Sequence, residues 1–294
     1  MLQSVSGTGV DAARVARDTP VHQLSLCFER DRFRVTRQDP PWKVVRAFAL
    51  PGSGCLVHLN NVSGGVLAGD RLALAVEVQE GAAAQITTTG ATRLYRHRAG
   101  AADSEQRAIF LVANGGLLEY LPDAMIPYAG SRHLQQTEIR LGRRSTLFWW
   151  EVLAPGRLAA GERFAFERLR VKTAVYAGVR PVLQEDYLLE PAVKDPSATA
   201  RMSRYSHTAS FCVVQEGRPP AFWRALEDRL NELARERTRH GQAVWGASML
   251  WSDGVVVRGL SMSACFIHET LIEFWGVARV AVTGMDAVPP RKVY

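Results

Sequence analysis

The sequence lacks any apolar run approaching the roughly 20 residues that a helix needs to cross a bilayer. Residues 1–18 are small and polar and contain no apolar core, so they do not resemble a secretory signal. We therefore expect a cytoplasmic protein with a flexible N-terminal tail over residues 1–20. The remainder, residues 21–294, is predicted to form a single β-rich domain.

Cysteine and histidine are too scattered to form a local metal motif. The four cysteines, at positions 27, 55, 212 and 265, include no Cys-x-x-Cys pair, and no two histidines stand at ligand spacing. We expect free thiols in a reducing compartment. The loops Gly-x-x-x-x-Gly-Lys, Gly-x-Gly-x-x-Gly and Gly-x-Ser-x-Gly and the motif His-Glu-x-x-His are also missing, so nucleotide binding and two common hydrolase types lack support.

Lysine is rare, occurring only at positions 43, 172, 194 and 292, so the net charge of +7 comes almost entirely from arginine. These arginines are scattered, whereas nucleic-acid-binding proteins usually gather basic residues into a patch or stripe. Arginine is also favoured at protein interfaces. Docking onto an acidic protein surface is therefore an alternative use of this charge.

Short strands with turn signals between them dominate residues 21–215. Residues 71–78 alternate apolar and polar side chains, the mark of a half-buried strand. Similar runs occupy 85–89, 108–112, 136–141, 146–152 and 163–173. Their spacing predicts an antiparallel all-β body, and the lack of strand–helix alternation argues against a doubly wound α/β fold.

The last third changes to a helical pattern. Apolar residues recur at helical spacing over 219–240, which begins with two prolines, and again over 261–277. A hairpin is predicted between them at 247–258, and a surface loop at 190–204. The predicted fold class is therefore mainly β, with stacked strands and two helices in the C-terminal third.

The segment from 118 to 130 places two acids, Glu119 and Asp123, beside aromatic residues and the prolines Pro122 and Pro127. Because proline cannot donate to a strand ladder, we predict a shaped turn here rather than a central strand. Such a turn could present its acids for function, or they could simply be solvated.

Three further segments carry candidate residues, each with a structural alternative. Gly64, Gly65 and Gly69 precede Asp70 and indicate close backbone approach, or a bulge that leads into strand 71–78. A threonine run precedes Arg93 and Tyr95; Arg93 and Arg96 could pair with Glu119 or Asp123. Glu151, Arg157 and Glu162 suggest a hairpin with an acid near each strand end, or ordinary turn chemistry.

In order along the chain, these segments resemble one family. The motifs are Ser-Gly-Gly-x-x-x-Gly-Asp, Thr-Thr-x-x-Ala-Thr-x-x-Tyr-Arg, Leu-Glu-Tyr-Leu-Pro-Asp-x-x-Ile-Pro-Tyr-Ala-Gly and Glu-x-x-x-x-Gly-Arg-x-x-x-Gly-Glu. They are similar to those of the urease accessory proteins UreD, called UreH in some organisms, from about Leu24 to the C-terminus. Val62 and Ala124 depart from the family pattern, which commonly has proline there.

The resemblance implies a cytoplasmic scaffold with no enzymatic activity, built as a β-helix-like stack of strands. Such a scaffold takes part in maturation of the nickel enzyme urease. It binds the urease apoprotein and UreF, recruits the GTPase UreG through UreF, and forms a dimer of UreD–UreF pairs. No cofactor is bound tightly, and nickel passes transiently through a water-filled tunnel.

The resemblance also implies roles for particular residues. A conduit needs weak, spaced oxygen ligands, so the acids expected along a nickel path are Asp70, Glu119, Asp123, Glu151 and Glu162. The residues expected to bind partners or to maintain the motifs are Gly64, Gly65, Gly69, Arg93, Tyr95, Tyr120, Pro122, Pro127, Tyr128, Arg157, Trp223 and Trp275. The apolar faces around Trp223 and Trp275 are expected to be partly exposed.

Two other functions fit parts of the sequence. A β-rich carbohydrate-active enzyme could use Glu119 with Asp123, or Glu151 with Glu162, as its acid and base pair. An arginine-rich nucleic-acid binder would show steeply salt-dependent binding.

Overall fold

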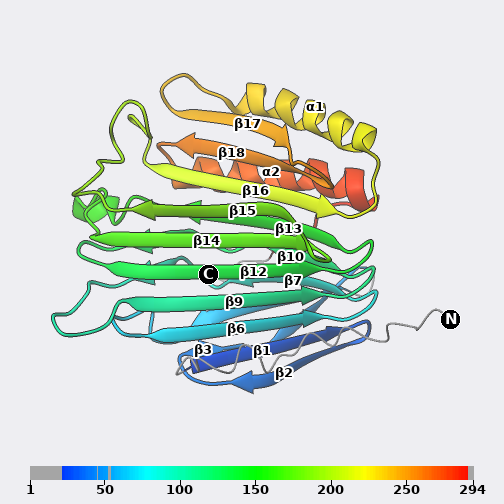
Figure 1. The fold of residues 1–294 in the computed structure, drawn as a ribbon, viewed down its shortest axis with the longest axis horizontal. Coiled ribbons are helices and arrows are strands. Elements are labelled where there is room, and N and C mark those ends of the chain that lie inside the picture. Colours follow the sequence, from blue (N-terminus) through cyan, green and yellow to red (C-terminus); the bar gives the residue numbers. More distant parts are fainter. Residues whose placement is uncertain (1–21, 45, 52–53, 291–294) are drawn as a thin grey trace.

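The computed structural model describes residues 22–44, 46–51 and 54–290. The predicted tail over 1–20 lies outside these residues. The described chain is mainly β, with two stacked mixed sheets and two helices (Figure 1). Within the described ranges, no helix is long and apolar enough to span a membrane.

The first sheet has seven strands in the order β15-β14-β12-β9-β6-β1-β2. Their bounds are β1 (His22–Glu29), β2 (Arg32–Gln38), β6 (Arg71–Val78), β9 (Ser104–Val112), β12 (Arg132–Leu141), β14 (Arg168–Ala177) and β15 (Arg180–Leu189).

The second sheet follows the path β17-β18-β16-β13-β10-β7-β5-β3, with β4, β8 and β11 attached beside it. The bounds are β3 (Trp42–Lys43), β4 (Ala47–Leu50), β5 (Gly54–Asn61), β7 (Ala83–Thr88), β8 (Thr92–Leu94), β10 (Leu117–Tyr120), β11 (Met125–Pro127), β13 (Thr146–Leu153), β16 (His207–Gln215), β17 (Ala243–Met249) and β18 (Gly254–Ser261). The helices are α1 (Pro220–Arg237) and α2 (Ala264–Thr283), and a 3-10 turn η2 covers Leu158–Ala160.

From β5 to β14 the chain coils back and forth between the two sheets. Each new strand lies parallel to the previous strand of its own sheet, so β6, β9, β12 and β14 form one parallel set and β5, β7, β10 and β13 the other. This confirms the β-helix-like stack. Antiparallel pairing, predicted from turn spacing for the whole body, occurs only toward the sheet ends. Turn spacing reports strand length, but here the short turns join strands of opposite sheets.

The coil places long loops at one end and short turns at the other. Strands of the first sheet are followed by short turns near residues 79–82, 113–116 and 142–145. Strands of the second sheet are followed by the long loops 62–70, 89–103, 121–131 and 154–167. Because successive coils stack in register, these long loops gather at one end, which we call the loop end. Each loop contains part of one of the motif segments.

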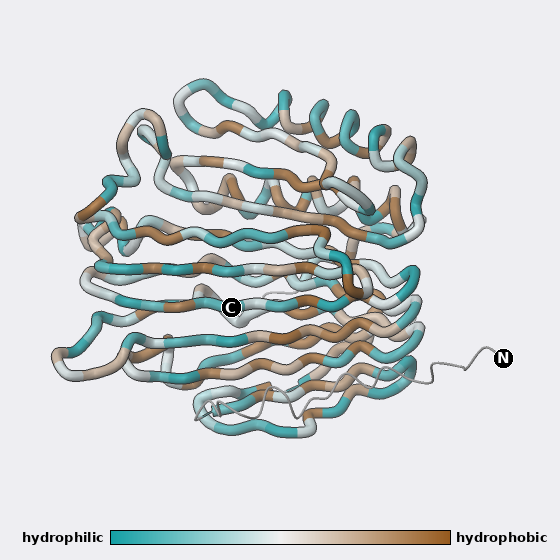
Figure 2. Tube along the Cα trace, viewed as in Figure 1, coloured by the Kyte–Doolittle hydropathy of each residue, from teal (hydrophilic) through white to brown (hydrophobic). Residues whose placement is uncertain are grey.

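The apolar core has two layers. One fills the space between the sheets, and the other lies between the second sheet and the two helices. Figure 2 shows hydrophobic and hydrophilic residues alternating along the strands, as half-buried strands require. Trp223 and Trp275 belong to the second layer and are 1% and 0% exposed, so the expectation that they are partly exposed is wrong. Their helices turn the apolar faces onto the sheet.

The helices lie close to their predicted ranges. α1 begins at Pro220, as the proline pair indicated, and ends at Arg237. α2 begins after Ser263, whose side chain accepts a hydrogen bond from the Phe266 N–H, and ends at Thr283, followed by Gly284 in the left-handed conformation. The surface segment after β15, residues 190–206, contains turns but no helix or strand.

Candidate functional site

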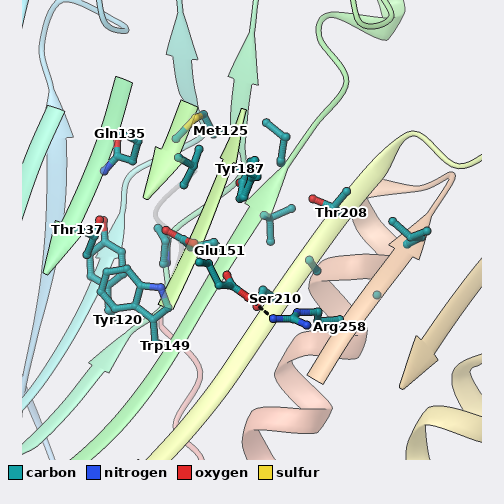
Figure 3. A pocket seen from close by; sticks show the side chains of 18 of the residues that line it. Tyr120, Met125, Gln135, Thr137, Trp149, Glu151, Tyr187, Thr208, Ser210 and Arg258 are labelled. Atoms are coloured by element: carbon teal, nitrogen blue, oxygen red, sulfur yellow. Dashed lines mark hydrogen bonds and ion pairs between the residues drawn. The ribbon is translucent and has the colours of Figure 1, made fainter. Parts of the chain in front are cut away.

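A cavity of about 800 Å³ lies between the sheets where β13, β15, β16 and β18 meet (Figure 3). One wall is aromatic: the Tyr120 ring stacks on the Trp149 ring, with ring centroids 4.3 Å apart. Phe110 meets both rings edge-on. The buried Trp149 Nε1 lacks a hydrogen-bond partner among the described residues.

Carboxylates from both sheets face this cavity. Glu151, on β13, accepts hydrogen bonds from the Thr173 hydroxyl at 3.1 and 3.2 Å, which connects the two sheets. Glu185, on β15, pairs with Arg258 of β18 at 2.6 Å. Burial raises the pKa of Glu151 to about 7, the charge of Glu185 adds to the rise, and the Thr173 bond opposes it. Glu151 can therefore exchange a proton or accept a cation near neutral pH.

Asp123 lines the same cavity from the loop that follows β10. Its N–H donates to the Thr88 hydroxyl oxygen at 2.9 Å, and the Thr88 hydroxyl lies 3.3 Å from its carboxylate. A smaller pocket of about 230 Å³, bounded by the loops near 60–66 and 88–93, shares Thr92, Gln106 and Tyr120 with the large cavity. The inner space therefore extends towards the loop end, with Tyr120 where the two volumes meet.

Glu119 faces the opposite side of the second sheet. It is 2% exposed and accepts hydrogen bonds from Trp275 Nε1 at 3.0 Å and Arg279 Nε at 2.8 Å, both on α2. The Gln85 side chain donates a third bond at 3.0 Å. Because side chains alternate along a strand, Glu119 points to the helix layer while Tyr120 points into the cavity.

The prediction that 118–130 is a turn rather than a central strand is wrong for its first residues. Leu117–Tyr120 forms β10, which pairs with β7 on one side and β13 on the other. Proline prevents ladder pairing only at its own position, and Pro122 comes after the strand ends. The suggested pairing of Glu119 with Arg93 or Arg96 is replaced by its pairing with Arg279.

At the loop end, motif residues form a second cluster, the Tyr128 cluster. It contains Tyr95, Tyr128, Arg157 and Glu162. The Arg157 guanidinium lies 4.2 Å from the centroid of the Tyr128 ring, and Tyr95 meets that ring edge-on. Glu162 accepts bonds from Arg157 Nε at 2.9 Å and from the Ala129 N–H at 3.1 Å. The predicted 151–162 hairpin is instead an arch, because β13 and β14 belong to different sheets.

The glycine segment packs directly against this cluster. Gly64 and Gly69 have φ of 77° and 82°, and the Gly64 carbonyl accepts a bond from Arg93 at 3.2 Å. The Asp70 carboxylate accepts the Leu67 N–H at 2.8 Å and closes a local turn. Asp70 and Glu162 thus make local contacts, and neither lines the large cavity.

Gly65 should not tolerate alanine. An added Cβ would lie 2.5 Å from the Arg93 carbonyl oxygen and 2.6 Å from the Tyr95 ring. We expect Gly65→Ala to lower the free energy of unfolding by about 1–3 kcal/mol, measured by urea denaturation. Gly90→Ala, where an added Cβ has no described atom within 4 Å and φ is not positive, is the matched control and should change this free energy by less than about 1 kcal/mol. Equal effects would contradict the close packing at Gly65.

Similarity to known proteins extends over most of this chain. The family model described as UreD urease accessory protein matches residues 22–294. The chain belongs to the UreD family. A relative from Herpetosiphon aurantiacus named urease accessory protein UreD is 40% identical over 275 residues, covering 92% of this chain and 94% of the relative. A relative of the same name from Dechloromonas aromatica is 32% identical over 268 residues, covering 90% and 89%.

The geometry of this UreD chain gives little support to a carbohydrate-active enzyme or to a nucleic-acid binder. Glu119 and Asp123 lie on opposite faces of the second sheet, and Glu162 is bonded to Arg157 away from Glu151. Neither predicted acid pair shares a cavity. On the outer face of the first sheet, arginines pair with neighbouring acids, as in Arg107–Glu105, Arg140–Glu138 and Arg170–Asp186, which reduces the charge available to nucleic acid.

The cavity contains residues that the sequence analysis missed. Glu185, Arg258, Trp149 and Tyr187 line it, and Glu185 and Arg258 are 73 positions apart. The alternation of β15 was the one available signal, since it places Glu185 and Tyr187 on the inner side. In the described part of the chain, no group of three or more His, Cys, Asp or Glu residues could hold a metal ion.

Proposed function

We propose that this chain is a urease maturation factor that performs no reaction of its own. It acts in the cytoplasm as a scaffold that binds the urease apoprotein and UreF, and through UreF it recruits UreG. Two copies assemble as a dimer of UreD–UreF pairs. The family match over residues 22–294 and the accessory-protein names of the relatives support this role.

The inner cavity is the feature that suits assistance in nickel delivery, with nickel as cargo. Asp123 and Glu151 provide carboxylate oxygens on its wall, and Tyr120 lines both this cavity and the smaller neighbouring pocket. Oxygen ligands spaced along a wet path bind a divalent ion weakly and release it. Of the five predicted acids, Asp123 and Glu151 therefore make the transit contacts, whereas Glu119, Asp70 and Glu162 maintain the surrounding structure.

The Tyr128 cluster is the proposed docking surface for a partner of this machinery. It combines partly exposed aromatic rings with an arginine that Glu162 already holds in place. Tyrosine and arginine are enriched among residues that dominate binding energy, and pre-ordered side chains lose less entropy on binding.

Co-expression with the urease genes tests the transit role. The double variant Asp123→Asn, Glu151→Gln should lower urease activation by about tenfold or more while the complex with UreF still forms, because the amides remove charge at little change in shape. Asp70→Asn, away from the cavity, should leave activation within about twofold. Nickel content of the purified urease is the second readout. Normal activation by the double variant would exclude these acids from the path.

A further inference from the structure

The second sheet extends beyond the edge of the first. β15 is the last strand of the first sheet, whereas the second continues through β16, β18 and β17. Figure 1 shows these three strands above β15 with no strand of the first sheet in front of them. Their inner face borders the cavity mouth. We call it the shelf, and its residues are Thr208, Ser210, Val244, Gly246, Arg258 and Leu260.

The shelf residues lie in two cross-strand rows. Thr208 is opposite Leu260, which is opposite Val244, and Ser210 is opposite Arg258, which is opposite Gly246. All six are partly or fully exposed, although side chains on the reverse face of the same strands are buried against the helices. The shelf is therefore a sheet face that no strand of the described chain covers.

The backbone edge of β15 beside the shelf is open. In the described part of the chain, β15 pairs with β14 alone. The edge of β17, in contrast, is closed by a side chain. Asn231 of α1 accepts a hydrogen bond from the Ala247 N–H at 2.9 Å and donates one to the Ala247 carbonyl at 3.0 Å. An unpaired strand edge is a template for another strand, and the described residues close one such edge with side chains but leave the other open.

Packing within the described part of the chain does not require glycine at position 246. At Gly259 an added Cβ would lie 2.2 Å from the Trp245 ring, so internal packing demands glycine there. At Gly246 no described atom lies within 4 Å of an added Cβ, and φ is not positive. Glycine inside a strand often marks a place where another backbone approaches closely.

The charges at the mouth favour a basic ligand. The cavity contains the carboxylates of Asp123, Glu151 and Glu185 and one guanidinium, that of Arg258, which pairs with Glu185. This is a local exception in a chain with a net charge of +7. Glu151 and Glu185 line the same cavity, and a cation that enters it would be attracted by both carboxylates.

We propose that an extended segment of a partner protein pairs with β15 as an additional strand of the first sheet and lies on the shelf. The segment alternates apolar residues and includes a lysine or arginine that reaches Glu185 and Glu151. Backbone hydrogen bonds to β15 supply affinity, and the shelf rows and carboxylates supply specificity. This binding goes beyond the scaffold role, because it defines a site and a ligand chemistry.

Peptide display on the full-length chain tests the proposal. Random peptides of about ten residues, the length of β15, are selected on the wild type and re-measured on Gly246→Val. Valine favours a strand and its Cβ would have no described atom within 4 Å, so this variant should fold normally, as circular dichroism and thermal unfolding will show. Selected peptides should alternate apolar residues around a basic one and bind Gly246→Val about tenfold more weakly.

Two modifications of a selected peptide separate strand addition from general adhesion. Methylation of the amides on the edge that faces β15 should weaken binding about tenfold, whereas methylation of the alternate amides should not. Replacing the basic residue by glutamate should weaken it similarly. Failure to enrich such peptides, equal affinity for Gly246→Val, or indifference to methylation would each overturn the proposal.

Two other occupants give distinct results in the lone chain. If a second copy covered the shelf, sedimentation would show a dimer that Gly246→Val abolishes. If the chain's own terminal segment covered it, β15 amides would exchange slowly with deuterium at every protein concentration. The proposal instead requires a wild-type monomer in which the open edge of β15 exchanges rapidly, and either alternative would overturn it.

Discussion

Replacing Glu119 by alanine should lower the free energy of unfolding by about 3–5 kcal/mol, because Arg279 would be left charged and buried without its partner. The pair is closed to water, with side chains 2% and 8% exposed, and Glu119 also accepts the Trp275 indole N–H. The Arg279 guanidinium donates as well to the Asp286 carbonyl, so the same network fixes the segment that follows α2. Urea denaturation followed by circular dichroism measures the loss.

Two further variants show whether the loss comes from the stranded charge. Replacing both partners, as Glu119→Leu with Arg279→Met, should cost less than Glu119→Ala alone, because no uncompensated charge remains. Asp123→Ala, which removes a hydrogen-bonded acid on the opposite face of the sheet, should cost about 1 kcal/mol. If Glu119→Ala destabilises no more than Asp123→Ala, the buried pair is not what holds α2 on the sheet.

The Glu119 result also determines how urease activation data should be interpreted. Glu119 and Asp123 are four positions apart and both belong to the most specific family motif. Lower urease activation by Glu119→Ala would follow from a smaller folded fraction of the protein. Lower activation by Asp123→Asn would instead indicate that a carboxylate in the cavity is needed. Reduced activation by Glu119→Ala without loss of stability would contradict the structural role assigned to this acid.

Local patterns of apolar residues predicted the positions of a half-buried strand and of a helix well. The alternation at 71–78 coincides with β6, and the helical spacing near 219–240 encloses α1. Strand direction could not be predicted in this way, since a short turn after β9 leads to the other sheet rather than to a neighbouring strand. Direction depends on which strands meet after a full coil, and this is a long-range property.

Local sequence patterns also predicted only part of the candidate site. Motif order identified the loops that gather at one end, and Asp123 and Glu151 do face the cavity. The face on which Glu119 lies depends on where β10 begins, and a one-residue change in phase reverses it. The Glu185–Arg258 pair joins strands from opposite sheets, so no local spacing could indicate it.

The second large effect is a pH dependence that Glu151 confers on stability. The folded protein raises the pKa of Glu151 from 4.5 to about 7, mainly through burial. Between these values the folded state binds a proton that the unfolded chain has released, so stability decreases as pH rises through this window and then levels off. At 1.36 kcal/mol per pKa unit, the total decrease approaches about 3 kcal/mol.

As the pH rises from 4.5 to 8, the stability of Glu151→Gln relative to the wild type should therefore increase by about 3 kcal/mol. The amide keeps its acceptor for Thr173 but has no charge to bury. The measurement is urea denaturation of both proteins at several pH values. His133 is common to both proteins, so its depressed pKa, caused by burial, cancels in the difference. Glu138→Gln, at an exposed pair with Arg140, is the control and should give a difference that varies by less than about 1 kcal/mol. A Glu151→Gln difference that stays constant with pH would mean that water reaches this carboxylate freely, and the cavity could then not present it as a partly protonated ligand.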